Sequence, residues 1–247
     1  MIRLQKAILL IAGQGTRLRP LTEKMPKCLV EVKRKAILIN ALENLAKNNI
    51  KEAILVVGYL KEKIKEKIGD ELDGMKITYI ANDLYEQTNN TYSLWLAIKD
   101  LDEDLLILEG DIFFEEELLK RFIEDKREDL TIVEKYNSKL DGTFVEVVDD
   151  QRILSWVHKK DRPIGFTLKN KYKTVNIHKF SGSFIRNWLI PALEKHAKDK
   201  KGKEPIESMF SDIIKNQGKI YVFDAKGLLW IEIDDVDDLK RAEEIFK

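Results

Sequence analysis

The first half of the chain alternates short apolar runs with segments whose apolar residues recur at helical spacing. The runs have the length of buried strands, and the periodic segments have the length of helices. Such alternation implies right-handed crossovers and a mostly parallel sheet that helices cover on both faces. The predicted strands are residues 6–12, 52–57, 76–81, 105–108 and 130–133. The predicted helices are residues 37–46, 60–68, 92–98 and 115–124.

The pattern changes after about residue 134. Short strands are predicted among polar loops at 143–148, 153–157 and 174–177, and later strands at 220–223 and 230–233. Helices are predicted at 184–197, 206–215 and 236–246, with Asp235 as the N-cap of the last one. No linker rich in Pro, Gly or Ser separates the halves. We therefore expect one α/β domain, 1–247, with an elaborated C-terminal half.

The charges of the chain balance, since 43 Lys and Arg residues stand against 43 Asp and Glu residues. A zero net charge argues against bulk electrostatic binding to nucleic acid or to an anionic membrane. One cysteine excludes an internal disulfide and any CxxC motif. The longest early apolar run, 7–12, is far shorter than the roughly 20 residues that span a bilayer. We expect a cytoplasmic protein without nucleic-acid or membrane partners, and the sequence leaves open whether it forms a homo-oligomer.

A glycine-rich string begins where the first predicted strand ends. It reads Ala12-Gly13-Gln14-Gly15-Thr16-Arg17-Leu18-Arg19-Pro20-Leu21-Thr22, and Pro26-Lys27 follows. Two glycines allow consecutive backbone N–H groups to turn toward one point, which suits phosphate oxygens, and Arg17 and Lys27 add cationic donors. A dinucleotide fingerprint would need a third glycine at Leu18, and a Walker loop would need Gly-Lys-Ser/Thr, which does not follow Gly13.

This string resembles the nucleotidyltransferase family, whose members join a nucleoside triphosphate to a sugar phosphate or another phosphate monoester. The stretch Asn89-Asn90-Thr91-Tyr92-Ser93-Leu94 resembles the Asn-x-Tyr-Ser-Leu segment of its cytidylyltransferases, which act on phosphocholine, inositol 1-phosphate or aminoethylphosphonate. Segments 173–177 and 230–235 are similar to the phosphocholine-type branch. The resemblance implies a Rossmann-like three-layer α/β/α fold, Mg²⁺ and a sequential displacement. It also implies a nucleotide-binding half, about 1–134, and an acceptor-binding half, about 135–247.

Arg17, Lys27 and Asp111 are the expected catalytic residues. Both substrates are anions, so charge neutralisation and positioning dominate the reaction, and a phosphate dianion needs no general base. Asp111 follows a strand in Glu109-Gly110-Asp111, where the family carries a metal-binding aspartate. Asp111 and Asp234 are the expected ligands of Mg²⁺, which prefers oxygen. Asp234 also stands at the start of the closing helix, where a carboxylate can serve as a cap.

The resemblance carries further contacts onto this sequence. Asn89, Asn90 and Ser93 would read the cytosine edge or cap the helix that they begin. Lys135, Lys173 and Asn176 would contact the acceptor, although a solvated lysine is an equal reading of the first two. The expected nucleotide contacts are Ala12, Gly13, Gln14, Gly15, Thr16, Arg17, Lys27, Asn89, Asn90, Ser93 and Asp111.

Three functions are compatible with these residues. The first is a Mg²⁺-dependent transferase that moves CMP from CTP to a small phosphorylated or phosphonate acceptor and releases pyrophosphate. The second is a sugar-1-phosphate nucleotidyltransferase that uses UTP, dTTP or GTP. The third is a regulatory module that binds nucleotide without turnover, and the presence of Arg17, Lys27, Asp111 and Asp234 together argues against it.

Overall fold

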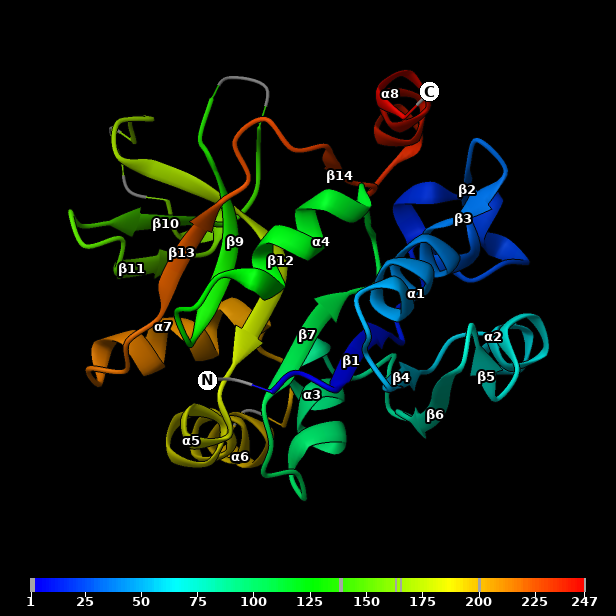
Figure 1. The fold of residues 1–247 in the computed structure, drawn as a ribbon, viewed down its shortest axis with the longest axis horizontal. Coiled ribbons are helices and arrows are strands. Elements are labelled where there is room, and N and C mark those ends of the chain that lie inside the picture. Colours follow the sequence, from blue (N-terminus) through cyan, green and yellow to red (C-terminus); the bar gives the residue numbers. More distant parts are fainter. Residues whose placement is uncertain (1–2, 138–139, 163, 165, 200, 247) are drawn as a thin grey trace.

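The computed structural model describes residues 3–137, 140–162, 164, 166–199 and 201–246. A ten-stranded mixed sheet runs through the molecule, and helices lie on both of its faces (Figure 1). Its strands are β1 (Lys6–Ile11), β4 (Glu52–Val57), β5 (Glu71–Leu72), β6 (Met75–Ala81), β7 (Leu105–Glu109), β9 (Leu130–Lys135), β10 (Phe144–Val147), β11 (Ile153–Val157), β12 (Lys171–Phe180) and β13 (Tyr221–Asp224). Two small sheets pair β2 (Glu31–Val32) with β3 (Lys35–Ala36) and β8 (Ile112–Phe114) with β14 (Trp230–Glu232).

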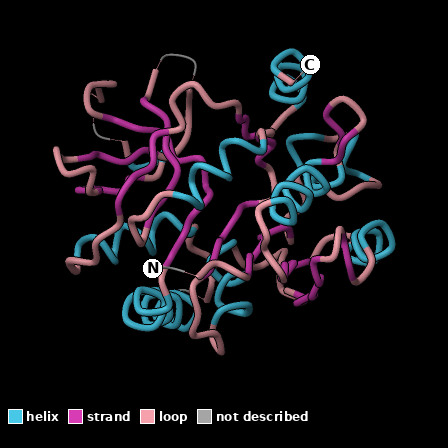
Figure 2. The backbone as a smooth tube through the Cα atoms, viewed as in Figure 1, coloured by secondary structure: helices cyan, strands magenta, loops and turns pink. Residues whose placement is uncertain are grey.

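Figure 2 distinguishes the helices from the strands and loops by colour. They are α1 (Ile37–Lys47), α2 (Lys61–Ile68), α3 (Asn90–Ile98), α4 (Glu116–Glu124), α5 (Gly182–Phe184), α6 (Ile190–Asp199), α7 (Ile206–Lys215) and α8 (Val236–Ile245). The segment predicted as one helix, 184–197, contains a π-helical stretch, Ile185–Leu189, between α5 and α6. Among the described residues, none of these helices is both long and apolar enough to cross a membrane.

The central sheet confirms the largely parallel α/β fold. Strands β7, β1, β4 and β6 are neighbours in this order and run parallel. The C-terminal half adds β12, which pairs antiparallel with β7, β9 and β10. Strand β12 extends beyond the predicted range 174–177 at both ends. The flanking Lys173 and Lys179 are polar and therefore do not read as part of a buried strand, but they are buried at 3% and 1% exposure.

Alternation along the strands produces the three layers. In β1, Ala7 and Leu9 pack with apolar residues of α1, α2 and α4, whereas Ile8 and Leu10 pack with those of α3, α6 and α7. Because the central strands are covered on both faces, they read as continuous apolar runs rather than alternating ones. The carboxyl ends of β1 and β7 therefore meet at one edge of the sheet, between the two helical layers.

Helix α8 closes the fold over the two small sheets. Its Ala242 packs with Val32, Phe113 and Ile233 in a third apolar cluster. Asp235 caps α8 as predicted, since its side chain accepts from Asp237 N and Asp238 N. This cap and the β8–β14 pair hold the start of α8 beside the carboxyl end of β7, where Ile233 N donates to Asp111 O.

Candidate active site

The glycine-rich loop is shaped around Lys27. Gly15 adopts a left-handed conformation, with φ of 61°, and a Cβ there would stand 2.7 Å from the Cβ of Lys27. The Thr22 hydroxyl donates to the Gly15 carbonyl at 2.7 Å. Any side chain at Gly15 would be strained and would displace Lys27. The glycine-rich loop therefore fixes the position of the Lys27 side chain.

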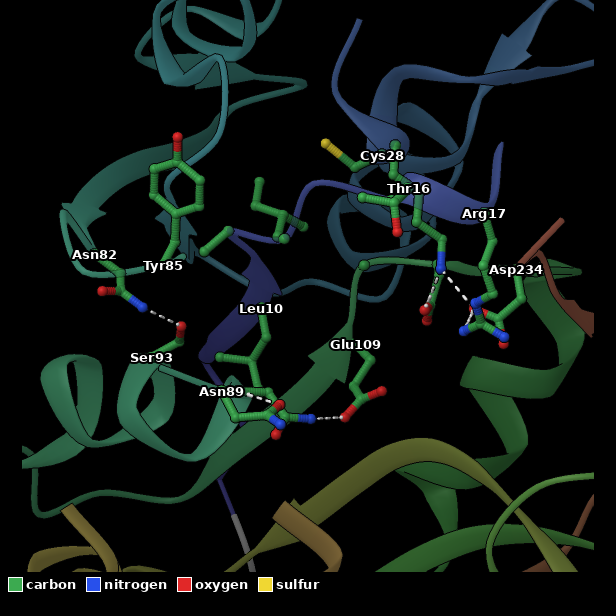
Figure 3. A pocket seen from close by; sticks show the side chains of 18 of the residues that line it. Leu10, Thr16, Arg17, Cys28, Asn82, Tyr85, Asn89, Ser93, Glu109 and Asp234 are labelled. Carbon is green, nitrogen blue, oxygen red and sulfur yellow. Dashed lines mark hydrogen bonds and ion pairs between the residues drawn. The ribbon is translucent and has the colours of Figure 1, made fainter. Parts of the chain in front are cut away.

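Lys27 joins two carboxylates that are distant in sequence (Figure 3). Its Nζ lies 2.8 Å from Asp111 Oδ2 and 2.8 Å from Asp234 Oδ1, and Arg17 Nη2 lies 2.7 Å from Asp234 Oδ1. Burial disfavours the Lys27 charge, yet the two aspartates outweigh it and raise the pKa of Lys27. Burial likewise opposes ionisation of Asp234, but Lys27 and Arg17 lower its pKa. The predicted catalytic and metal-binding residues therefore meet at one point.

A third carboxylate completes an acidic cluster. One carboxylate oxygen from each of Asp111, Glu232 and Asp234 lies within 4.8 Å of the others. Asp111 Oδ1 is buried and has no hydrogen-bond partner in the described part of the chain. Burial, together with Asp111 and Asp234, raises the pKa of Glu232. An all-oxygen set with an unsatisfied buried oxygen fits a hard divalent cation such as Mg²⁺.

Two cavities meet at this cluster. The first, of about 420 Å³, is lined by the glycine loop, the ends of β1 and β7 and the start of α3. The second, of about 1190 Å³, is lined by β9, β12, β14, the loop before β10, the segment after β11, the first turn of α7 and one side of α8 along its length. Arg17, Glu232 and Asp234 line both cavities. Two ligands could thus occupy separate spaces and contact each other at the carboxylates.

Small polar side chains line the end of the first cavity away from Asp234, as Figure 3 shows. Buried Asn82 donates to Ser93 Oγ at 3.0 Å. Asn89 caps α3 with a bond from Asn90 N to its Oδ1 at 2.8 Å. Asn90 donates to Glu109 Oε1 at 2.6 Å and accepts from Ile206 N at 2.9 Å, so both ends of its amide are already bonded.

Glu109 lies between the two halves of the molecule. Its second oxygen accepts from Asn176 Nδ2 at 3.2 Å, and Asn176 has a φ of 61° where the pairing of β12 with β9 is irregular. Burial and then the nearby Asp111 raise the pKa of Glu109 well above its usual range. Glu109 thus ties α3, through Asn90, to β12, through Asn176.

The structure brings most of the predicted site residues together. Ala12, Gly13, Gly15, Thr16, Arg17, Lys27, Asn89, Asn90, Ser93 and Asp111 line the first cavity. Asp234 lines both cavities, and Lys173 lines the second, where its Nζ pairs with Glu232 Oε2 at 2.8 Å. Burial opposes the charge of Lys173, but Glu232 raises its pKa.

Three predicted residues lie outside the described lining of both cavities. Gln14 donates to Glu86 at 3.4 Å instead. Lys135 is exposed on β9, and its neighbour Glu134 lines the second cavity, because adjacent residues of a strand face opposite sides. Asn176 bonds to Glu109 rather than facing a cavity. The structure thus places Glu134, rather than Lys135, along the second cavity, and it places Asn176 beside Glu109.

Comparison with known proteins identifies the family. A model described as "Nucleotidyl transferase" matches residues 6–246. The choline-phosphate cytidylyltransferase of Streptococcus pneumoniae is 32% identical over 254 residues, which cover 98% of each chain. The CMP-5'-(3-aminopropyl)phosphonate synthase of Streptomyces rubellomurinus is 33% identical over 239 residues, and these are 96% of this chain but 38% of that protein. The solved structure of CTP:phosphocholine cytidylyltransferase from Streptococcus pneumoniae matches all of this chain with a TM-score of 0.79 at 28% identity. Sequence, fold and site agree, and the chain belongs to the nucleotidyl transferase family.

Proposed function

We propose that this protein is a Mg²⁺-dependent cytidylyltransferase. It transfers CMP from CTP to a small acceptor that bears a phosphate or phosphonate, and it releases pyrophosphate. The observation that carries this proposal is the meeting of two cavities at Arg17, Lys27 and the acidic cluster. The activities for which the two relatives are named support CMP as the transferred group and a phosphate or phosphonate as its acceptor.

In this proposal the first cavity holds the nucleotide. The backbone of the loop from Ala12 to Thr16 holds the triphosphate, and Arg17 and Lys27 neutralise the charge that develops on the α-phosphate. Asn82, Asn89 and Ser93 stand where the base would lie, and their amide and hydroxyl groups match the donors and acceptors of cytosine.

The metal belongs at the junction of the cavities. Asp111, Glu232 and Asp234 would hold Mg²⁺, which when bound withdraws charge from the phosphate oxygens. Lys27 keeps the two aspartates aligned and holds its ammonium at the same junction. These residues position the reactants for in-line attack, and they draw on both the nucleotide-binding half, about 1–134, and the acceptor-binding half, about 135–247.

The second cavity holds the acceptor. Its phosphate or phosphonate oxygen attacks the α-phosphorus directly, so no general base is required. Lys173 lines this cavity, with its Nζ 2.8 Å from Glu232 Oε2, and it opposes the rise in the pKa of Glu232 that burial causes. In this proposal Lys173 belongs to the acceptor side.

The test is pyrophosphate release with Mg²⁺, using each of the four common nucleoside triphosphates. The acceptors are phosphocholine, aminoethylphosphonate, inositol 1-phosphate, glycerol phosphate and glucose 1-phosphate. We expect release with CTP and an acceptor that is not a sugar 1-phosphate. Release only with UTP, dTTP or GTP and glucose 1-phosphate would overturn the assignment of the base. Nucleotide binding without release from any pair would favour the regulatory module.

A further inference from the structure

The second cavity has a floor of charged and polar residues that neighbouring strands hold in register. Lys173 of β12 lies opposite Glu134 of β9. On its other side, Thr174 N donates to the carbonyl of Thr143, directly before β10, at 3.4 Å. The Thr143 hydroxyl in turn donates to Glu207 Oε1 of α7 at 2.9 Å. Glu134 and Glu207 thus lie on either side of Lys173 in the cavity lining.

Most charges in this lining are already neutralised. Lys173 pairs with Glu232, and Arg17 pairs with Asp234. Asp141 pairs with Lys159 and Arg162, which follow β11, and Lys160 is a further cation of the same lining. Asp238 pairs with Arg241 at the wall formed by α8.

Glu134 and Glu207 differ from these carboxylates. Glu134 accepts from the indole Nε1 of Trp230 at 2.6 Å, and Glu207 accepts from the Thr143 hydroxyl. Both donors are neutral, and neither carboxylate has an ion-pair partner in the described part of the chain. A half-buried carboxylate that lacks a cation is costly unless a ligand supplies one.

We propose that the acceptor carries a cationic amine in addition to its phosphate or phosphonate, and that Glu134 and Glu207 bind that amine. This rests on the proposed function. Arg17 and the metal-binding carboxylates mark the end of the cavity where the phosphorus group reacts. Of the other carboxylates in the lining that have no ion pair, Asp235 caps α8 and Glu244 is exposed, which leaves Glu134 and Glu207 as the half-buried groups that suit a cation. A zwitterionic aminoalkyl phosphate or phosphonate matches both ends, whereas a neutral polyol phosphate leaves the two carboxylates unpaired.

The experiment uses pairs of acceptors that differ in charge but not in shape. Phosphocholine is compared with neohexyl phosphate, its carbon isostere, and aminoethylphosphonate is compared with propylphosphonate. With CTP and Mg²⁺, we expect the cationic member of at least one pair to have a KM about tenfold lower than its neutral partner, since a hydrogen-bonded charge pair contributes that much. The kcat values of the two partners should lie within about threefold.

Two variants locate the effect. Glu134→Gln and Glu207→Gln keep an oxygen for the Trp230 and Thr143 donors and remove only the charge. Each should raise the KM of the cationic acceptor and reduce the tenfold preference to about threefold or less, while the neutral isostere keeps its KM. Glu243→Gln is the matched control, because Glu243 is an exposed residue of α8 outside the described lining of both cavities and should leave the preference unchanged.

The outcomes separate the two proposals. Equal KM values within each pair, or a preference for inositol 1-phosphate over every amine, would overturn the amine while pyrophosphate release upheld the proposed function. A preference that survives both glutamine variants would overturn the assignment to Glu134 and Glu207. Calorimetric titration of the same pairs measures the preference without turnover, so absence of pyrophosphate release counts against the proposed function alone.

Discussion

The two cavities that meet at Arg17, Glu232 and Asp234 differ in size and in lining. The first is about 420 Å³, and away from the charged residues of the junction it is bordered by backbone of the glycine loop and by small neutral side chains. The second is about 1190 Å³, and acidic and basic side chains line it. A narrow cavity of backbone and amides suits one fixed ligand, whereas a wide charged one accommodates different acceptors through side-chain changes alone.

The cavities also differ in how the chain builds them. The first uses the ends of parallel strands, where loops converge in any sheet of this kind. The second uses antiparallel strands β9 and β12, the short strand β14 and helix α7, which come together only in the folded chain. Substitutions in one cavity should therefore leave the other intact, and only residues at the junction should affect both.

The largest effect is expected at the junction itself. Asp111→Ala removes a carboxylate of the acidic cluster and a partner of Lys27, so turnover should fall about a thousandfold at saturating Mg²⁺. Pyrophosphate release measures this, with Asp237→Ala on the exposed start of α8 as the control. Near-normal turnover of Asp111→Ala would place the reaction away from the junction.

Lys27→Met tests whether the junction depends on a cation for stability. Without Lys27, Asp111 and Asp234 face each other half-buried, with Arg17 pairing only Asp234, and the free energy of unfolding should fall by about 3 kcal/mol. Mg²⁺ should restore part of that loss in the variant and add less to the wild type. Urea unfolding with and without Mg²⁺ measures both, and an equal loss in the two conditions would contradict a cation site there.

Glu109→Gln tests whether the cavities are mechanically linked. A glutamine offers one oxygen where Asn90 and Asn176 now donate to two, so one amide must lose its partner. We expect the KM of CTP and the KM of the acceptor each to rise about fivefold, with a smaller change in kcat. A change confined to one substrate would show that Glu109 supports only one cavity.

Cys28 gives the smallest effect and tests the wall of the first cavity. Its side chain is 3% exposed, and burial raises the pKa of its thiol to about 12. Only the thiolate reacts with alkylating reagents, so iodoacetamide at pH 8 should not label the native protein and should label it in urea. Rapid labelling of the native protein that CTP prevents would instead place a reactive thiol inside the cavity.

The sequence predicts the first cavity better than the second for a physical reason. The string around Gly13 and Gly15 is contiguous, and Asp111 follows a clearly apolar strand, so local sequence patterns are sufficient to predict these residues of the cavity. Glu232 is not among the predicted metal ligands, although the sequence offers a signal for it. Residues two apart on a strand share a face, and Glu232 stands two residues before the predicted ligand Asp234.

The acceptor side depends on register and tertiary packing. The sequence pattern does not tell which of Glu134 and Lys135 faces the second cavity, since a shift of one residue on a strand reverses the face. Glu207 lines the cavity because α7 packs against β11 and bonds to Thr143 before β10, and no local pattern in the sequence indicates that placement. The sequence shows Glu109 only as a residue near Asp111 and does not predict its hydrogen bonds. Its two partners, Asn90 and Asn176, come from segments far apart in the chain.

The division of the substrates between the cavities can be measured directly with one variant in each. Ser93→Ala removes the partner of Asn82 in the first cavity, and Glu207→Gln removes a charge in the second. Steady-state kinetics should show a KM for CTP raised about fivefold in the first variant alone and a KM for the acceptor raised in the second alone, with independent effects in the double variant. If either variant raised the KM of both substrates equally, nucleotide and acceptor would not occupy the separate cavities proposed for them.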